Sequence, residues 1–293
     1  PPSQQKEDYP RDHAGEVMIA ADARLGARFW RTWTSQGVTP AMKFVVGDLP
    51  DIIEREIEGE PLPVEVKPPL TINGRIFPRE NIDVWAFAAK AGEEFVCRVE
   101  AQSLGSPLQA RLALIDPRGR EIAEALATQR GDPMLAFRAA SDGVYRIKIH
   151  DLNFGGLQHY VYRLTITGEP TVTSVFPLGG QRGKPLALEL TGFALPQKRI
   201  EVPLPAGASD LLEIPLKLGG KFSPRITLDV SDLAEHLERE PNNAPAERDV
   251  ITPPAVLNGR IDQPGDVYYW PVALKKNESV EFTPIASDRK STR

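Results

Sequence analysis

The sequence predicts an all-β fold made of tandem antiparallel β-sandwiches, some jelly-roll-like and others immunoglobulin-like. Two observations predict this class. Apolar and polar residues alternate with a period of two in several short runs, and turn-forming residues separate these runs at intervals of about 8–12 residues. Helix signals are weak throughout, and only residues 232–237 could form a single helical turn. The chain of 293 residues has room for about two domains of roughly 150 residues each.

The strongest alternation lies in two runs, residues 145–150 and 160–167. In the first run Tyr145, Ile147 and Ile149 alternate with charged or polar neighbours, and the second run repeats this pattern. A period of two buries one face of a strand, so both runs are predicted to be half-buried strands. Glycine, asparagine and proline supply the turns between the predicted strands, at 116–119, 141–143 and 153–156.

An internal repeat relates the first third of the chain to the last. Thr39–Leu49 resembles Ser223–Leu233 at an offset of 184 residues, and Asn73–Ile76 matches Asn258–Ile261 at an offset of 185. Solenoid repeats have periods of roughly 20–50 residues. This much longer period therefore predicts tandem domains and argues against a solenoid.

The repeat, together with changes in the pattern of apolar, proline and glycine residues between its copies, predicts four segments. Residues 1–49 are expected to be the C-terminal part of an immunoglobulin-like unit, and 50–169 a complete sandwich with roughly eight strands between 63 and 168. Residues 170–232, with short apolar runs broken by proline and glycine, are expected to form an immunoglobulin-like spacer. Residues 233–293 are expected to be the truncated beginning of a second sandwich.

Composition excludes several classes of function. A net charge of −5 leaves no basic field to attract phosphates, so the sequence predicts no nucleic-acid partner. The single cysteine, Cys97, cannot form an internal disulfide or a multi-thiolate metal site. No run of residues approaches the roughly 20 apolar residues that span a membrane, so no membrane span is expected in this chain.

Several motifs resemble the bacterial pre-peptidase C-terminal domain. They are Asn73–Ile76, Asp83–Glu93, Leu104–Leu108, Leu114–Gly119 and Asp142–Tyr145. The resemblance identifies 50–169 and, in part, 233–293 as pre-peptidase C-terminal-like domains. The same motifs are also similar to the calcium-dependent collagen-binding modules of clostridial collagenases. Phe176–Gly183 resembles the opening of immunoglobulin-like spacers in large secreted proteins of planctomycete-type bacteria.

This resemblance implies a β-sandwich appended to secreted enzymes and surface proteins. An extracellular, cell-surface or periplasmic location is therefore expected. Most of the matched residues belong to turns and to the core, so they carry more information about fold than about function.

No arrangement of residues typical of an enzyme occurs in the sequence. It has no Gly-x-Ser-x-Gly elbow, no His-Glu-x-x-His and no phosphate-binding glycine loop. None of the four histidines is spaced from another as metal ligands are. Cys97 alternates with Phe95 and Val99 on an apolar strand face, a position typical of a buried thiol. The chain is therefore predicted not to be an enzyme.

Acidic residues next to the two predicted sandwiches form a candidate calcium site in each copy of the repeat. Oxygen ligands at alternate positions of an extended segment point to one side, and Ca²⁺ takes about 6–8 oxygens. The candidate ligands are Glu54, Glu56, Glu58 and Asp83 in the first copy, and Glu238, Glu240, Asn242, Asn243 and Asp266 in the second. The resembled family commonly has two aspartates in Gly-Asp-x-Asp, whereas each copy here has one, with Asn81 and Tyr268 in the other positions. A solvated acidic linker is the alternative interpretation.

These observations predict a non-catalytic fragment of a secreted or surface bacterial protein that acts in spacing, adhesion or substrate docking and is stabilised by Ca²⁺. The alternative is an accessory region of a secreted peptidase or other hydrolase whose catalytic domain lies outside this chain. A third hypothesis, a carbohydrate-binding module, predicts exposed aromatic side chains on a sheet face.

The four tryptophans bear on this third hypothesis. Trp85 and Trp270 occupy equivalent positions in the repeat and are predicted to be core residues, whereas Trp30 and Trp33 fall in 15–48, which is predicted to contain the closing strands of an earlier copy. The expected ligand is an extracellular protein or a polysaccharide, and the sequence leaves the oligomeric state open.

Overall fold

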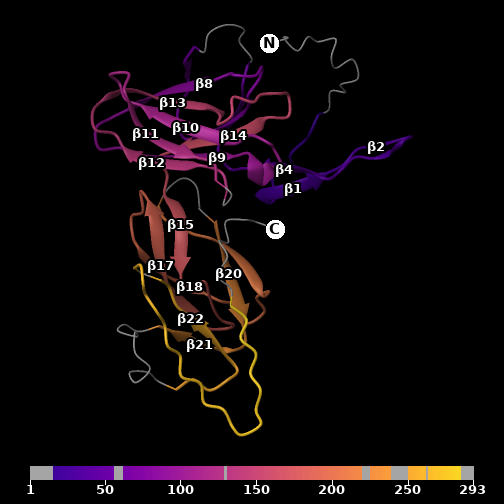
Figure 1. Ribbon diagram of the computed structural model, residues 1–293, viewed down its shortest axis with the longest axis vertical. Coiled ribbons are helices and arrows are strands. Elements are labelled where there is room, and N and C mark those ends of the chain that lie inside the picture. The colour runs from indigo at the N-terminus through magenta and orange to yellow at the C-terminus, as the bar shows by residue number, and fades with distance from the viewer. Residues whose placement is uncertain are drawn as a thin grey trace. The chain divides into compact units, whose positions relative to one another are not determined.

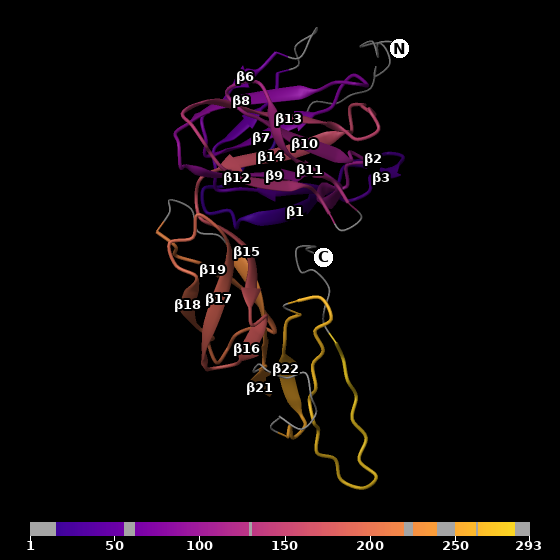
Figure 2. The same cartoon turned by 60° about the vertical axis from the view of Figure 1, so that its left-hand side comes forward.

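The computed structural model describes residues 16–55, 62–128, 131–219, 225–238, 250–261 and 263–284. Across these ranges the chain is all-β, with one short 3-10 helix, η2 (Gln102–Leu104). No helix in the described ranges is long and apolar enough to cross a membrane. The chain divides into a first compact unit up to Glu169 and a second from Pro170 to Ser287 (Figures 1 and 2). The finer division into four segments stays a prediction.

Two five-stranded sheets form most of the first unit (Figure 1). In sheet order, one contains β11 (Glu121–Leu126), β10 (Ala110–Ile115), β13 (Gly143–Asp151), β8 (Asp83–Ala89) and β6 (Val64–Glu65). The other contains β12 (Met134–Arg138), β9 (Glu94–Glu100), β14 (Val161–Thr167), β7 (Leu70–Arg75) and β5 (Asp51–Ile53). The edge strands β5 and β6 pair in parallel with β7 and β8.

The residues that face each other between these sheets form one hydrophobic core. Tyr145, Ile147 and Ile149 of β13 are buried, as the alternation of that run predicts. Trp85 is also buried, in agreement with the core role predicted for it. The same prediction for Trp270 is wrong, because that side chain is only half-buried and belongs to neither core of the described residues. Cys97 lies in the same core as Trp85, where burial raises the pKa of its thiol. A buried, protonated thiol is a poor nucleophile.

The predicted arrangement as tandem antiparallel β-sandwiches, jelly-roll-like and immunoglobulin-like, is wrong. From β5 to β14 almost every strand crosses to the sheet opposite its predecessor, and only β10 and β11 follow each other in one sheet. The chain thus winds in coils that stack along the sheets, an arrangement of the β-solenoid type. A period of two shows which face of a strand is buried but not which strands become neighbours, so the sequence could not reveal this winding. The period of 184–185 residues also led to a wrong conclusion about the solenoid. It relates two distant parts of the chain, whereas each coil contains far fewer residues.

A long hairpin precedes these sheets. Strand β1 (Gly26–Trp30) pairs antiparallel with β4 (Met42–Val46). The short strands β2 (Trp33–Thr34) and β3 (Gly37–Val38) continue the hairpin to its tip (Figure 1). Its base is tied to η2, since the Lys43 ammonium donates a hydrogen bond of 2.6 Å to the carbonyl oxygen of Ser103.

The second unit contains two three-stranded sheets around a core of its own. One has the order β15 (Thr171–Phe176), β17 (Pro185–Phe193) and β18 (Arg199–Pro203). The other has β16 (Gly179–Gln181), β20 (Arg225–Ser231) and β19 (Leu211–Pro215), with β16 parallel to β20. Leu188, Leu228 and Val230 are central to the core between them.

A further parallel pair, β21 (Ala234–Leu237) and β22 (Ala255–Asn258), follows in this unit (Figure 2). The helical turn considered for residues 232–237 is wrong, because β21 occupies residues 234–237. This pair repeats the register of β5 and β7, as Ile53 faces Asn73 and Leu237 faces Asn258.

Candidate metal centre

Four of the nine predicted metal ligands lie in the described ranges: Glu54, Asp83, Glu238 and Asp266. The other five lie outside them: Glu56, Glu58, Glu240, Asn242 and Asn243. The four described carboxylates form two pairs, one in each copy of the repeat.

Asp83, the first residue of β8, is buried and receives two side-chain hydrogen bonds. The Tyr162 hydroxyl donates to Oδ2 at 2.7 Å, and the Asn81 amide donates to Oδ1 at 2.8 Å. The Tyr162 oxygen in turn accepts a bond of 3.1 Å from the indole Nε1 of Trp85. Tyr162 belongs to β14, whereas Asp83 and Trp85 belong to β8, so these bonds connect the two sheets through the core.

Glu54 and the same tyrosine both lie close to Gly74. The backbone N–H of Glu54 donates to the carbonyl of Asn73 at 2.9 Å, and its Oε2 accepts from the backbone N–H of Arg75 at 2.9 Å. Between these two contacts lies Gly74, directly opposite Tyr162 in the β7–β14 pairing. A Cβ on Gly74 would lie 2.5 Å from the Tyr162 oxygen and 2.6 Å from Glu54 Oε2. The glycine therefore leaves the space in which the phenol and the carboxylate both lie.

The electrostatics of this cluster keep Tyr162 protonated. Burial is the largest cause that raises its pKa above the ordinary value, and the negative charges of Asp83 and Glu54 raise it further. The hydrogen bond that Tyr162 donates to Asp83 acts in the same direction. Two carboxylates that share one buried neighbour form a site where a bound cation would offset their repulsion.

The second copy builds a similar cluster from different positions. Glu238 Oε2 accepts a 2.9 Å bond from the backbone N–H of Arg260, as Glu54 does from Arg75. The Tyr268 hydroxyl donates to Asp266 Oδ2 at 2.9 Å. A Cβ on Gly259 would lie 3.0 Å from Glu238 Oε2 and 3.6 Å from the Tyr268 ring. Tyr268 thus donates to the aspartate of its cluster from a position two residues away, whereas Tyr162 donates to Asp83 from a strand distant in the chain.

In the second copy an arginine lies close to the glutamate. The guanidinium Nε of Arg260 lies 3.9 Å from Glu238 Oε1, and its Nη1 lies 2.9 Å from Glu189 Oε2. Arg260 also packs over the Phe176 ring, 4.6 Å from the centroid. A cation at Glu238 would have to compete with this arginine.

The donor set of the first copy fits Ca²⁺ in kind. The carboxylates of Glu54 and Asp83 and the amide oxygen of Asn81 are hard ligands of the type that Ca²⁺ prefers, but they are fewer than the roughly 6–8 oxygens it takes. Within the described ranges no three His, Cys, Asp or Glu side chains form a group that could hold a metal. Further ligands would have to come from Glu56 and Glu58, whose positions the structure does not describe.

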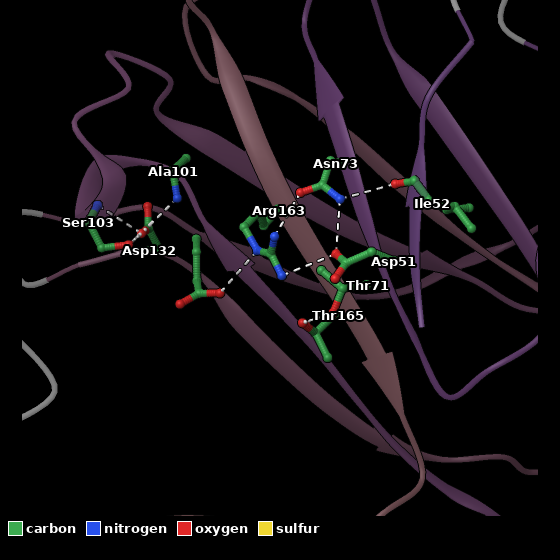
Figure 3. Close-up of polar contacts among 10 residues, drawn as sticks. Asp51, Ile52, Thr71, Asn73, Ala101, Ser103, Asp132, Arg163 and Thr165 are labelled. Atoms are coloured by element: carbon green, nitrogen blue, oxygen red, sulfur yellow. Dashed lines mark hydrogen bonds and ion pairs between the residues drawn. The ribbon is translucent and has the colours of Figure 1, made fainter. Parts of the chain in front are cut away.

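A second polar cluster fastens the linker strand β5 to the sheet (Figure 3). The Arg163 guanidinium lies 3.1 Å from Asp51 Oδ1 and donates to Asn73 Oδ1 at 2.9 Å. Asn73 donates from its Nδ2 to Asp51 Oδ1 at 3.0 Å and to the carbonyl of Ile52 at 3.2 Å. Arg163 Nε has no hydrogen bond and lies 4.0 Å from Glu100 Oε2. This cluster holds β5, and so places Glu54 beside Gly74.

The sequence did not reveal the residues that organise these clusters. Tyr162 and Arg163 lie on β14, about 80 residues beyond Asp83 in the chain, and only strand pairing brings them to the linker. Gly74 and Gly259 were visible as part of the repeated Asn-Gly-Arg-Ile motif. The signal available was the glycine inside a predicted strand, which often marks a close approach of another group.

Comparisons with known proteins find structural likenesses only. No known protein family matches the sequence, and no curated protein matches it. The pre-peptidase C-terminal domain of a Bacillus anthracis collagenase is 16% identical, covers 39% of this chain and 100% of its own, and has a TM-score of 0.30. PliG of Aeromonas hydrophila, a periplasmic inhibitor of g-type lysozyme, is 16% identical over 40% of this chain and 97% of its own, with a TM-score of 0.29. PliG of Salmonella Typhimurium is 12% identical over 40% and 96%, with a TM-score of 0.23. Likenesses of this size carry no function over to this chain.

Proposed function

We propose that this chain is a non-catalytic segment of a secreted or surface bacterial protein, located outside the cytoplasm, that acts in spacing, adhesion or substrate docking. We further propose that Ca²⁺ joins the linker carboxylates to the first residue of β8. The observation that carries the calcium proposal is geometric: Asp83 accepts a hydrogen bond from Tyr162, and Glu54 Oε2 lies beside Gly74, directly opposite the same tyrosine. Glu54 and Asp83 are 29 residues apart in the chain.

The chemistry of the described side chains supports a non-catalytic role. Cys97 is enclosed in the core, and burial raises the pKa of its thiol. His150 is buried, its Nδ1 lies 2.8 Å from the Asp151 carbonyl oxygen, and its ring stacks on Phe154. Neither residue has the exposed nucleophile-and-base geometry that hydrolysis requires.

The purified chain is therefore expected to show no peptidase, esterase or glycosidase turnover. General chromogenic substrates of each class, assayed with and without Ca²⁺, measure this directly. Turnover that disappears in Cys97→Ala or His150→Ala would contradict the proposal. Turnover that survives in both variants and co-purifies with the protein would contradict it as well.

Calcium is expected to raise the melting midpoint of the first unit by several degrees. A ligand that binds only the folded state at about 100 times its dissociation constant adds roughly 2.7 kcal/mol of stability, which corresponds to such a shift for a domain of this size. Scanning calorimetry of the whole chain with millimolar CaCl₂ against EDTA measures it. MgCl₂ at the same concentration should give less, because Mg²⁺ demands a stricter octahedral geometry.

Charge-neutralising variants separate a specific site from a general salt effect. Glu54→Gln and Asp83→Asn preserve side-chain size and are expected to reduce or abolish the calcium shift. Glu65→Gln, at an exposed carboxylate of strand β6, is the matched control and should keep it. An absent shift, or one that is equal in all variants, would leave the acidic linker as a solvated spacer.

A further inference from the structure

The hairpin formed by β1 to β4 exposes an unusual set of large side chains. Phe29, Trp30 and Trp33 are 62%, 47% and 75% exposed. Isolated exposed apolar residues are common on protein surfaces, but a contiguous group of them marks an interaction site. The hairpin has two faces, one in core-facing positions and one directed outward.

The equivalent hairpin of the second unit, β19 with β20, identifies the faces. Both hairpins pair in the same register, since Trp30 faces Met42 and Ile214 faces Ile226, each 184 residues further along. In β19 and the residues after it, Leu212, Ile214, Leu216 and Leu218 pack into the second core, whereas Leu211, Glu213, Pro215 and Lys217 are exposed. By this correspondence Trp30 takes a core-facing position, and the outward face of the first hairpin consists of Ala27, Phe29, Arg31 and Trp33.

Aromatic residues on this outward face are not required by the hairpin fold. At an offset of 184 residues Glu213 and Lys217 take the positions of Phe29 and Trp33, and β19–β20 pairs in the same register as β1–β4. Phe29 lies in β1, Trp33 begins β2, and Arg31 lies between the two strands. Four residues of extended chain span about 13 Å. Two flat apolar rings that flank a cation form a linear surface suited to an extended ligand.

The charge of the hairpin indicates what kind of extended ligand fits. Arg28, Arg31 and Lys43 are the only charged residues from Gly26 to Gly47, in a chain whose net charge is −5. The hairpin is therefore a local cationic region that attracts an anionic polymer. The tip adds Thr34, Ser35 and Gln36, whose hydroxyl and amide groups can hydrogen-bond to a ligand rich in hydroxyl groups.

We propose that the outward face of this hairpin binds an acidic polysaccharide, with Phe29 and Trp33 against sugar rings and Arg31 beside a carboxylate. The inference rests on the docking role proposed above and names the class of ligand for it. A lipid surface would desolvate the polar tip without compensating it. A nucleic acid binds through several cations that neutralise its closely spaced phosphates, whereas Arg31 is the one cation among the four residues of this outward face.

Affinity electrophoresis of the whole chain through gels that contain polygalacturonate tests this proposal, with neutral dextran as the reference polymer. Polygalacturonate is expected to retard the protein, dextran is not, and added salt should weaken the retardation. Trp33→Ala and Arg31→Ala should each weaken binding about tenfold, the factor that corresponds to 1.4 kcal/mol. Phe154→Ala and Arg98→Ala remove an exposed ring and an exposed cation elsewhere in the first unit and should leave binding unchanged.

Three results would overturn the proposal: no retardation by polygalacturonate, equal retardation of the hairpin variants and the parent chain, or binding to a thymidine oligonucleotide or to anionic phosphatidylglycerol vesicles in its place. Circular dichroism of each variant confirms that the substitution leaves the fold intact. Failure here is distinguishable from failure of the proposed function, because the calcium shift of the first unit does not depend on the hairpin.

Discussion

Replacing Tyr162 by alanine is expected to lower the free energy of unfolding of the first unit by about 4 kcal/mol or more. Removing a fully buried aromatic ring costs roughly 3–5 kcal/mol through lost burial and the cavity left behind. The variant also deprives the buried Asp83 carboxylate of its 2.7 Å donor and Trp85 Nε1 of its acceptor. Calorimetry or urea unfolding of the whole chain, followed through the first unit, measures the loss.

Tyr162→Phe separates the hydroxyl from the ring. It retains the packing and loses only the hydrogen bonds, so a loss of about 1–3 kcal/mol is expected from the unsatisfied partners. Tyr160→Phe, on a half-buried neighbour in the same segment, is the matched control and should cost little. Equal losses for the two phenylalanine variants would show that the Tyr162 hydroxyl does not organise the cluster.

The same pair of variants gives a dependence on pH with a definite sign. Folding raises the pKa of Tyr162, chiefly by burial and then by the charges of Asp83 and Glu54. Its contribution is therefore fully present below the ordinary tyrosine pKa of about 10 and is lost as the pH rises above that value, because the unfolded chain ionises first. Tyr162→Phe should lose stability less steeply above that pH than the parent chain or Tyr160→Phe.

Replacing Arg163 by alanine is expected to cost about 2–3 kcal/mol and to loosen the linker strand. Breaking a buried ion pair costs roughly 3–5 kcal/mol. The lower figure applies here because Arg163 is 12% exposed while its partners Asp51 and Glu100 are 40% and 28% exposed and are therefore partly screened. Asn73 Oδ1 also loses its 2.9 Å donor.

Hydrogen exchange locates this effect in the linker. The amide of Glu54, bonded to the Asn73 carbonyl at 2.9 Å, should exchange faster in Arg163→Ala, while amides of β13 keep their relative protection. Arg163→Lys retains the charge but not the planar fork, so an intermediate loss is expected. Arg98→Ala, at an exposed position of the neighbouring strand β9, should change neither quantity. Unaltered exchange at Glu54 would show that β5 is held by other contacts.

The stabilisation by Ca²⁺ is also expected to depend on Arg163. If an ion joins Glu54 to Asp83, the calcium shift should be smaller in Arg163→Ala, because Arg163 holds the strand that leads to Glu54. It should survive better in Tyr160→Phe, which leaves the cluster untouched. The proposed ligand set thus depends on residues that are not ligands themselves.

The sequence by itself determined which residues form strands and which of their faces are buried. Tyr145, Ile147 and Ile149 lie in the core because a period of two allows no other pattern for a strand with one covered face. The repeated Asn-Gly-Arg motif placed Gly74 and Gly259 in equivalent surroundings, each with a glutamate oxygen close to where a Cβ would lie. These features are local, so a short stretch of residues is enough to specify them.

Only the tertiary structure decided which strands became neighbours and therefore which side chains meet. Strands cross from sheet to sheet in stacked coils, and this brings Tyr162 of β14 to Asp83 of β8 and to Glu54 beyond β5. Alternation is identical for a strand in either sheet and beside any partner, so it holds no information about these pairings. In the pairing of β7 with β14, Tyr162 lies opposite Gly74, where a Cβ would clash with its ring. This close approach exists only once both strands are in place.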